Sequence, residues 1–260
     1  MSLRRVLGLA LIVLGSFSLV YADEIVHVLN GTCSITASAD GTQFELRLKR
    51  PCSSAHDCNQ TATEPPDAWS GISLASLSRE GSHIEAVLRA EAGSLTCSGT
   101  VHNQALEGSY TFAPSTQFVT RMESLGINGL TTEKLQAYTI FRIDSAWVES
   151  LQKEGIPGID SSNLIAMKIF NVEPAYVERL KDLGYATPSA QKLIALKVHR
   201  VDPEEIRQVR ALGYQPTLDE TLQMRIFKVT PAFIERMRSR GLNNLTISKL
   251  VQIRIFKLDE

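Results

Sequence analysis

The apolar residues of the C-terminal half recur with a period much longer than one helical turn. Glycines mark the period: Gly126, Gly155, Gly184 and Gly213 are 29 residues apart, and Gly241 follows after 28. Two series of apolar residues keep the same spacing. The first consists of Leu135, Leu164, Leu193, Leu222 and Leu250. The second consists of Ile143, Val172, Val201, Val229 and Leu258. Three anchors with one period predict an array of about five repeats of 28–29 residues.

Each repeat has the pattern of two short helices. In residues 174–202, Tyr176, Val177 and Leu180 share one helical face, and charged residues cover the other. Pro174 suits the first helical position, where its missing N–H costs nothing, and Gly184 suits a left-handed C-terminal cap. A second helix is expected over 189–199. Similar proline and glycine signals occur in the following repeats.

Helices of this length are marginal on their own in water. One pair cannot bury its apolar faces, so neighbouring pairs must stack and at least three are needed. The sequence therefore predicts an all-α, solenoid-like domain over residues 115–260. The expected period is shorter than that of tetratricopeptide or ankyrin repeats, and neither consensus fits.

Residues 23–114 have a different period. Phe44, Leu46 and Leu48 alternate with charged residues, as in a strand with one buried face. Further alternating runs follow up to Phe112, separated by turn residues such as Asp40-Gly41. This pattern predicts an antiparallel β-sandwich or small barrel, so the fold class is α+β in two domains. Residues 51–68 are expected to form a long loop.

The first 22 residues have the features of a secretory signal peptide. Arg4 and Arg5 precede an apolar run from Val6 to Val20, and Ala22 offers a cleavage site before Asp23. The alternative, a membrane anchor, is disfavoured because a bilayer-spanning helix needs about 20 residues. The expected location is periplasmic or extracellular, with no membrane span after cleavage.

Four cysteines lie before the repeats: Cys33, Cys52, Cys58 and Cys97. An even number in an exported domain indicates disulfides, and we expect the pairs 33–97 and 52–58, although three pairings are open. A metal site with help from His56 is the alternative, but the Cys-x5-Cys spacing fits no structural zinc pattern well.

The composition suits a folded protein, with 43% hydrophobic and 21% charged residues. Charge is uneven: residues 23–114 carry five basic and eleven acidic side chains, a net charge of −6, and residues 115–260 carry twenty and seventeen, a net charge of +3. The excess of positive charge in residues 115–260 is small and the protein is expected to be exported, and both points argue against nucleic-acid binding.

No catalytic, cofactor-binding or metal motif is present in the sequence. The five histidines share no metal-binding spacing. A hydrolytic site built from His83, His102 and nearby carboxylates is the enzyme hypothesis that we keep, below the expectation of surface histidines.

The runs Leu183-Gly184-Tyr185 and Leu212-Gly213-Tyr214, with the segment from Ala92 to Pro114, resemble the tail of certain bacterial extracytoplasmic proteins. This tail follows the membrane metallopeptidase part of some β-lactam-sensor-type regulators. The peptidase part has no counterpart here, so the resemblance implies an exported accessory or sensor-like module without that activity.

These observations predict a non-enzymatic exported protein, without cofactors, whose helical repeats form a scaffold for binding another protein or for sensing. The alternative is binding of a small apolar ligand or glycan by the β domain, and a hydrolase comes third. The sequence does not indicate an oligomeric state.

Overall fold

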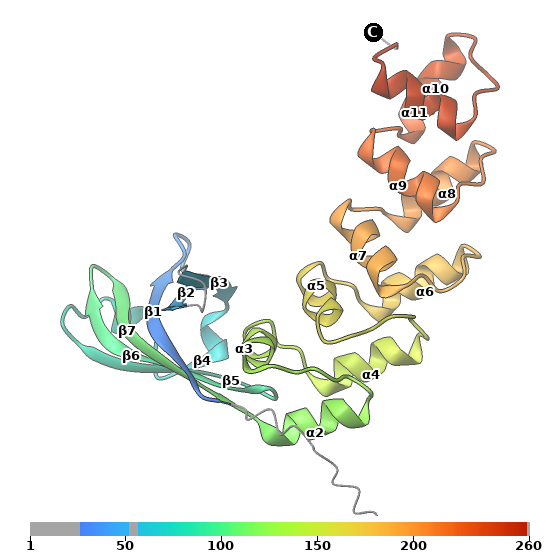
Figure 1. Ribbon diagram of the computed structural model, residues 1–260. Helices are drawn as coiled ribbons and strands as arrows, with labels where there is room; N and C mark the ends of the chain where they lie inside the picture. The colour runs from blue at the N-terminus through green and yellow to red at the C-terminus, as the bar shows by residue number, and fades with distance from the viewer. Residues whose placement is uncertain (1–26, 52–56, 259–260) are drawn as a thin grey trace, which may run out of the picture.

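The computed structural model describes residues 27–51 and 57–258, in which strands come first and helices follow (Figure 1). The strands are β1 (Leu29–Ala37), β2 (Phe44–Pro51), β3 (Asp57–Glu64), β4 (Trp69–Ser70), β5 (His83–Ala90), β6 (Gly93–His102) and β7 (Ala105–Pro114). A 3-10 helix, η1 (Pro66–Ala68), and the short α1 (Leu74–Leu77) lie between them. The predicted α+β class is confirmed.

The strands form one antiparallel sheet in the order β3-β2-β1-β7-β6-β5-β4. β3 and β4 are the two edge strands of this single sheet and do not pair with each other. The sheet is therefore a curled half-barrel rather than two packed sheets or a closed barrel. The expected loop over residues 51–68 is partly wrong, since residues 57–64 pair with β2 along its length. The threonine-rich sequence of β3 suits a solvated edge strand, whose backbone bonds need no apolar alternation.

The sheet bends sharply about β7. The disulfide joins Cys33 on β1 to Cys97 on β6, the two neighbours of β7, with 6.1 Å between the Cα atoms. Two strand spacings of about 4.8 Å would separate them by roughly 9.6 Å in a flat sheet. Gly108 of β7 pairs with both Cys33 and Gly99, and a Cβ there would meet Ser98 O at 2.1 Å. Glycine is therefore required where the sheet folds.

Ten helices of the described residues follow, in five consecutive pairs that we number as units 1 to 5. They are α2 (Thr116–Ser124) and α3 (Thr132–Ile140); α4 (Ser145–Lys153) and α5 (Asn163–Ile169); α6 (Pro174–Asp182) and α7 (Ala190–Val198); α8 (Pro203–Ala211) and α9 (Leu218–Ile226); α10 (Pro231–Ser239) and α11 (Ile247–Ile255). A glycine with positive φ follows the first helix of each pair, as the Schellman-type stop requires.

The second helix of each pair also ends at a left-handed residue, which is not glycine. These residues are Arg142, Asn171, Arg200, Lys228 and Lys257, with φ between 51° and 56°. Left-handed backbone is uncommon outside glycine, so the recurrence shows that the same turn is built five times among the described residues. Four of the five side chains are cations at a helix C-terminus, where the helix dipole favours positive charge.

Unit 4 corrects one of the predicted apolar series. Its second helix is capped by Thr217, four residues after Gly213, whereas Ser189 in unit 3 lies five residues after Gly184. Counting from the caps, Thr221 and not Leu222 is equivalent to Leu193. Thr221 is buried and Leu222 is half-buried. The shorter spacing before Gly241 therefore comes from a loop that is one residue shorter.

Successive units are joined by a recurring hydrogen bond. The side chain three residues before the glycine donates to the carbonyl of the residue that ends the first helix of the preceding unit. The four bonds are Gln152 Nε2 to Leu125 O (2.7 Å), Lys181 Nζ to Glu154 O (2.9 Å), Arg210 Nη1 to Leu183 O and Arg238 Nη2 to Leu212 O. Each satisfies a carbonyl that a helix end otherwise leaves without a partner.

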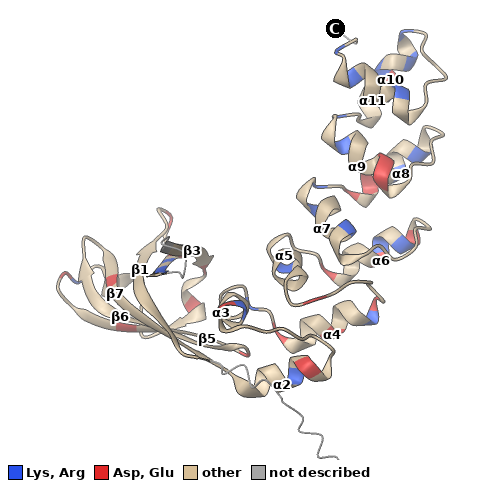
Figure 2. Ribbon diagram, in the orientation of Figure 1, with Lys and Arg blue, Asp and Glu red and all other residues tan. Residues whose placement is uncertain are grey.

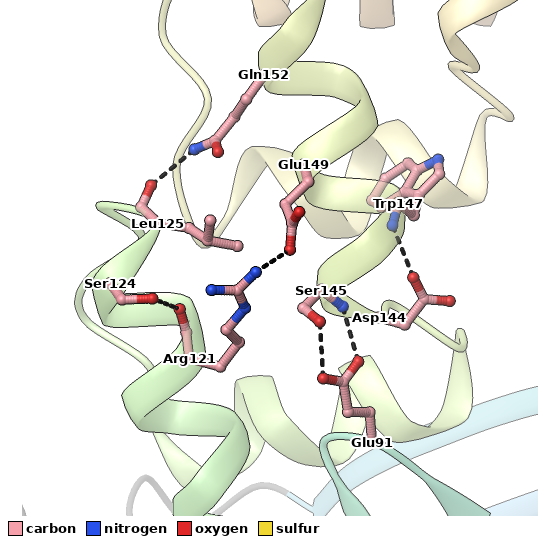
Figure 3. Close-up of polar contacts among 9 residues, drawn as sticks. All are labelled: Glu91, Arg121, Ser124, Leu125, Asp144, Ser145, Trp147, Glu149 and Gln152. Carbon is pink, nitrogen blue, oxygen red and sulfur yellow. Dashed lines mark hydrogen bonds and ion pairs between the residues drawn. The ribbon is translucent and has the colours of Figure 1, made fainter.

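The sheet is attached directly to the first two units. Helix α3 packs against β5, β6 and β7, and one hydrophobic cluster continues from the sheet through the helices to Ile206. Glu91, in the turn between β5 and β6, accepts hydrogen bonds from the backbone N (2.8 Å) and Oγ (2.7 Å) of Ser145 at the start of α4 (Figure 3). This carboxylate lies at the positive end of the helix dipole, which stabilises the junction.

Among the described residues, no helix combines the length and the hydrophobicity that crossing a bilayer requires.

Candidate interaction surface

The cysteines meet the prediction as far as they are described. The pair Cys33–Cys97 is confirmed, and both residues are buried. Cys58 is also disulfide-bonded, whereas its predicted partner, Cys52, lies outside the described residues, as does His56.

The two histidines of the hydrolase hypothesis have separate partners. His83 Nε2 lies 3.2 Å from Ser98 Oγ, and His102 Nδ1 lies 3.1 Å from the Glu80 carboxylate. His83, His102 and Glu80 are exposed, and Ser98 is half-buried. Within residues 27–51 and 57–258, no group of three His, Cys, Asp or Glu side chains could hold a metal ion.

Seven of the eleven exposed large apolar side chains among the described residues lie at the C-terminal ends of α5, α7, α9 and α11. We call this set the apolar ridge; it consists of Ile169, Phe170, Val198, Ile226, Phe227, Ile255 and Phe256. Their exposed fractions run from 36% for Phe227 to 66% for Phe256. The helices that carry them follow one another along one side of the helical part, the side that faces the sheet in Figure 1. We therefore take the apolar ridge as the candidate interaction surface.

The equivalent surface of unit 1 is covered by the chain itself. Ile140, which corresponds to Ile169 and Ile226, is 0% exposed because α3 packs against the sheet. Gln136 and Thr139 on the same helix face are buried as well. The helix face that packs against the sheet in unit 1 is thus present in the later units, where its apolar side chains are exposed.

Cations lie directly behind the ridge and are held by aromatic rings. In units 2, 3 and 5, the residue before the last of the second helix is a Lys or Arg, and it lies over the aromatic side chain at the third position of the first helix. The distances to ring centroids are 4.6 Å from Lys168 Nζ to Trp147, 4.9 Å from Lys197 Nζ to Tyr176 and 5.0 Å from Arg254 Cζ to Phe233. Unit 4 has Glu205 at the aromatic position, and Arg225 Nη1 lies 3.3 Å from its carboxylate.

Tyr176 shows how firmly these rings are placed. Its hydroxyl donates to Val201 O at 3.0 Å, and burial raises the pKa of this phenol well above its usual value. The ring is therefore a neutral, fixed platform for Lys197. We conclude that this column of cations has a structural role in addition to its charge.

The sequence carries the signal for the ridge, although apolar spacing alone hides it. Four units end their second helix with the dipeptide Ile-Phe, at 140–141, 169–170, 226–227 and 255–256, and unit 3 has Val198-His199. These positions look like the core of an amphipathic helix, and only the stacking direction shows that they point outward. Figure 2 shows basic residues recurring along the helical part.

The chain matches no protein-family model, no curated protein and no solved structure.

Proposed function

We propose that this protein is a non-enzymatic, exported scaffold in which a disulfide-tied β domain (23–114) precedes a solenoid-like array of five two-helix repeats (115–260). In this proposal the array binds another protein along the apolar ridge. Export is supported by the buried Cys33–Cys97 disulfide, since such bonds form in oxidising compartments. The predicted signal peptide lies outside the described residues.

One comparison within the chain carries the proposal. The same helix face is fully buried by the sheet at Ile140 and is about half exposed at Ile169, Ile226 and Ile255. Burying one isoleucine side chain contributes about 1.5–3 kcal/mol. A partner that covers several of these side chains as the sheet covers Ile140 therefore gains enough free energy for a specific complex.

The test compares the full chain with two variants in cells of its host. The ridge variant carries Ile226→Ser and Phe227→Ser, and the control carries Leu74→Ser, an exposed apolar residue of the β region. After cross-linking in the native compartment and affinity capture, we expect a partner that is retained by wild type and by the control and is lost from the ridge variant. Equal capture by all three proteins would refute the proposal.

A groove on the sheet supports the second candidate, ligand binding by the β domain. It has a volume of about 1020 Å³ and lies over β1, β2 and β3. Its lining among the described residues is rich in hydroxyl, amide and charged side chains, including Thr32, Arg47 and Asn59, and contains no aromatic ring. These groups suit a polar glycan better than an apolar ligand. Native mass spectrometry of protein from its host tests this candidate, which predicts a bound glycan that Arg47→Ala releases.

A further inference from the structure

Unit 3 contains an open cleft in which several cations converge. The cleft has a volume of about 390 Å³ and lies between the end of α5, helix α6 and the start of α8. Its walls include Phe170 of the ridge, the ring of Tyr176 and the cations Arg179, Lys197 and Arg200. The exposed cleft thus joins a positively charged wall to an apolar side chain.

The three cations are available to a ligand. Arg179 Cζ and Lys197 Nζ both lie over the ring of Tyr176 in the lining of the cleft, at 5.9 and 4.9 Å from its centroid. Neither of them, nor Arg200, forms an ion pair with a carboxylate among the described residues. Asp202, the acidic side chain in the lining, is engaged in capping α8 through the backbone N of Glu204 at 3.0 Å. The cleft therefore has an excess of positive charge.

Unit 1 shows what fills the equivalent place. Arg142 occupies the left-handed position that Arg200 occupies in unit 3. Its Nε donates to a carboxylate oxygen of Glu64, at the end of β3, at 3.0 Å, while the neighbouring Ile140 is buried against the sheet. An acidic side chain from an extended segment, next to apolar packing, is thus the observed occupant of this position.

The other units are less suited. Unit 2 has Asn171 and unit 5 has Lys257 at the left-handed position, and unit 4 already contains Glu205 beside Arg225. Unit 3 is the one in which the described residues combine an arginine at the left-handed position, two further cations and no internal carboxylate paired with them.

We propose that the cleft of unit 3 receives a carboxylate from an acidic, extended segment of the partner protein, whose adjacent apolar side chain packs on Phe170 and Val198. The proposal rests on the proposed scaffold function and specifies the chemistry of its partner. Packed helices are spaced by about 10 Å and extended chain advances about 3.3 Å per residue, so about three residues of the segment correspond to one unit.

The probe is a fluorescein-labelled peptide of four Leu-Glu-Ser triplets, with a twin in which every Glu is Gln. Binding to the purified full chain is measured by fluorescence anisotropy at low and at physiological salt. We expect the Glu peptide to bind at least tenfold more tightly than its twin, because charge-assisted hydrogen bonds to Arg and Lys are lost in the twin. Higher salt should weaken the Glu peptide selectively.

Variants locate the binding. Arg200→Asn removes the charge and keeps a residue that accepts left-handed backbone, as Asn171 does in unit 2; it should weaken the Glu peptide about tenfold. Arg200→Lys should recover most of this loss. Lys153→Gln, which removes an equal charge from an exposed position at the end of α4, should have no effect.

Each contrary result overturns the proposal. One such result is equal affinity for the two peptides. A second is that Arg200→Asn and Lys153→Gln change the affinity for the Glu peptide equally. A third is binding to vesicles of phosphatidylglycerol and phosphatidylethanolamine without binding to the Glu peptide. Competition by inorganic phosphate as effective as competition by unlabelled Glu peptide would show a simple anion site instead. If the Arg200→Asn variant still captures the ridge-dependent partner at full strength, the proposed carboxylate site in unit 3 is refuted and the proposed scaffold function is retained. If the ridge variant captures as wild type does, the scaffold function fails.

Discussion

Thr221 in unit 4 stands where the other units have a buried leucine, and replacing it with leucine should stabilise the protein. A cavity of about 20 Å³, room for about one water molecule, lies beside it and is lined by Val209, Met224 and Val229 among others. The cavity lies where the core divides, because Val209 and Met224 belong to a cluster separate from the one that extends from the sheet. Thr221→Leu fills this gap.

The expected gain follows from three contributions. Two additional buried carbon groups contribute about 1.6 kcal/mol, and filling the cavity contributes about 0.5 kcal/mol. The Thr221 hydroxyl loses its bond to Thr217 O (2.9 Å), which costs about 0.5–1 kcal/mol. That carbonyl keeps the backbone N–H of residue 221, also at 2.9 Å, so no acceptor is left unsatisfied. The net gain in unfolding free energy is about 1 kcal/mol.

Urea denaturation followed by far-ultraviolet circular dichroism measures the change, and hydrogen exchange of α10 and α11 shows whether the last units unfold less often. The matched substitution in unit 3, Leu193→Thr, should lower the unfolding free energy by about 3 kcal/mol because Leu193 is fully buried. Leu222→Thr should cost less, since Leu222 is half-buried. The equivalence of positions 193 and 221 would be refuted by two results together. Thr221→Leu would lower the unfolding free energy, and Leu222→Thr would lower it by more than Leu193→Thr does.

Three further predictions concern the joints of the fold. Arg210→Met removes the donor to the preceding unit's carbonyl and should cost about 1–2 kcal/mol in urea unfolding, and an unchanged midpoint would count against the inter-unit bonds. Replacing Cys33 and Cys97 with alanine opens a loop with a sequence separation of 64 and should cost about 4 kcal/mol, measured against wild type under non-reducing conditions. Burial raises the pKa of Glu64, with Arg142 opposing the shift, so the native state binds more protons than the unfolded chain above the usual carboxyl range. The contribution of Glu64 to stability should therefore fall as the pH rises above the usual carboxyl range. Glu64→Gln should remove this contribution, so the melting temperature of the variant should rise relative to wild type as the pH is raised; an identical pH dependence in both proteins would contradict it.

The sequence predicted the features that local chemistry determines. The helix stops at glycine, the proline at the start of α6 and the strand that begins at Phe44 follow from residues that are neighbours in the chain. The pairing of Cys33 with Cys97 was one of three possibilities, chosen because both lie in strand-like runs. Here the prediction succeeded because both strands flank β7.

Other features depend on contacts between distant residues. The bend of the sheet requires Gly99 and Gly108 to face each other, and register is not visible in the sequence. The assignment of β3 to a loop failed because an edge strand needs no buried face. The shortened loop of unit 4 was hidden because Leu222 happens to keep the 29-residue period. The outward direction of the ridge follows from stacking, which apolar spacing within one helix does not specify.

The attachment of α4 to Glu91 has a consequence for how chains of this design can change in length. The sheet covers α3 and supplies a capping group to α4, so the first two units depend on contacts with the sheet. All four junctions between units place a donor at the same position of the repeat and use the same carbonyl position, so we expect the units beyond the second to be interchangeable. Duplication or loss of units should therefore be tolerated toward the C-terminal end and should disrupt folding next to the sheet.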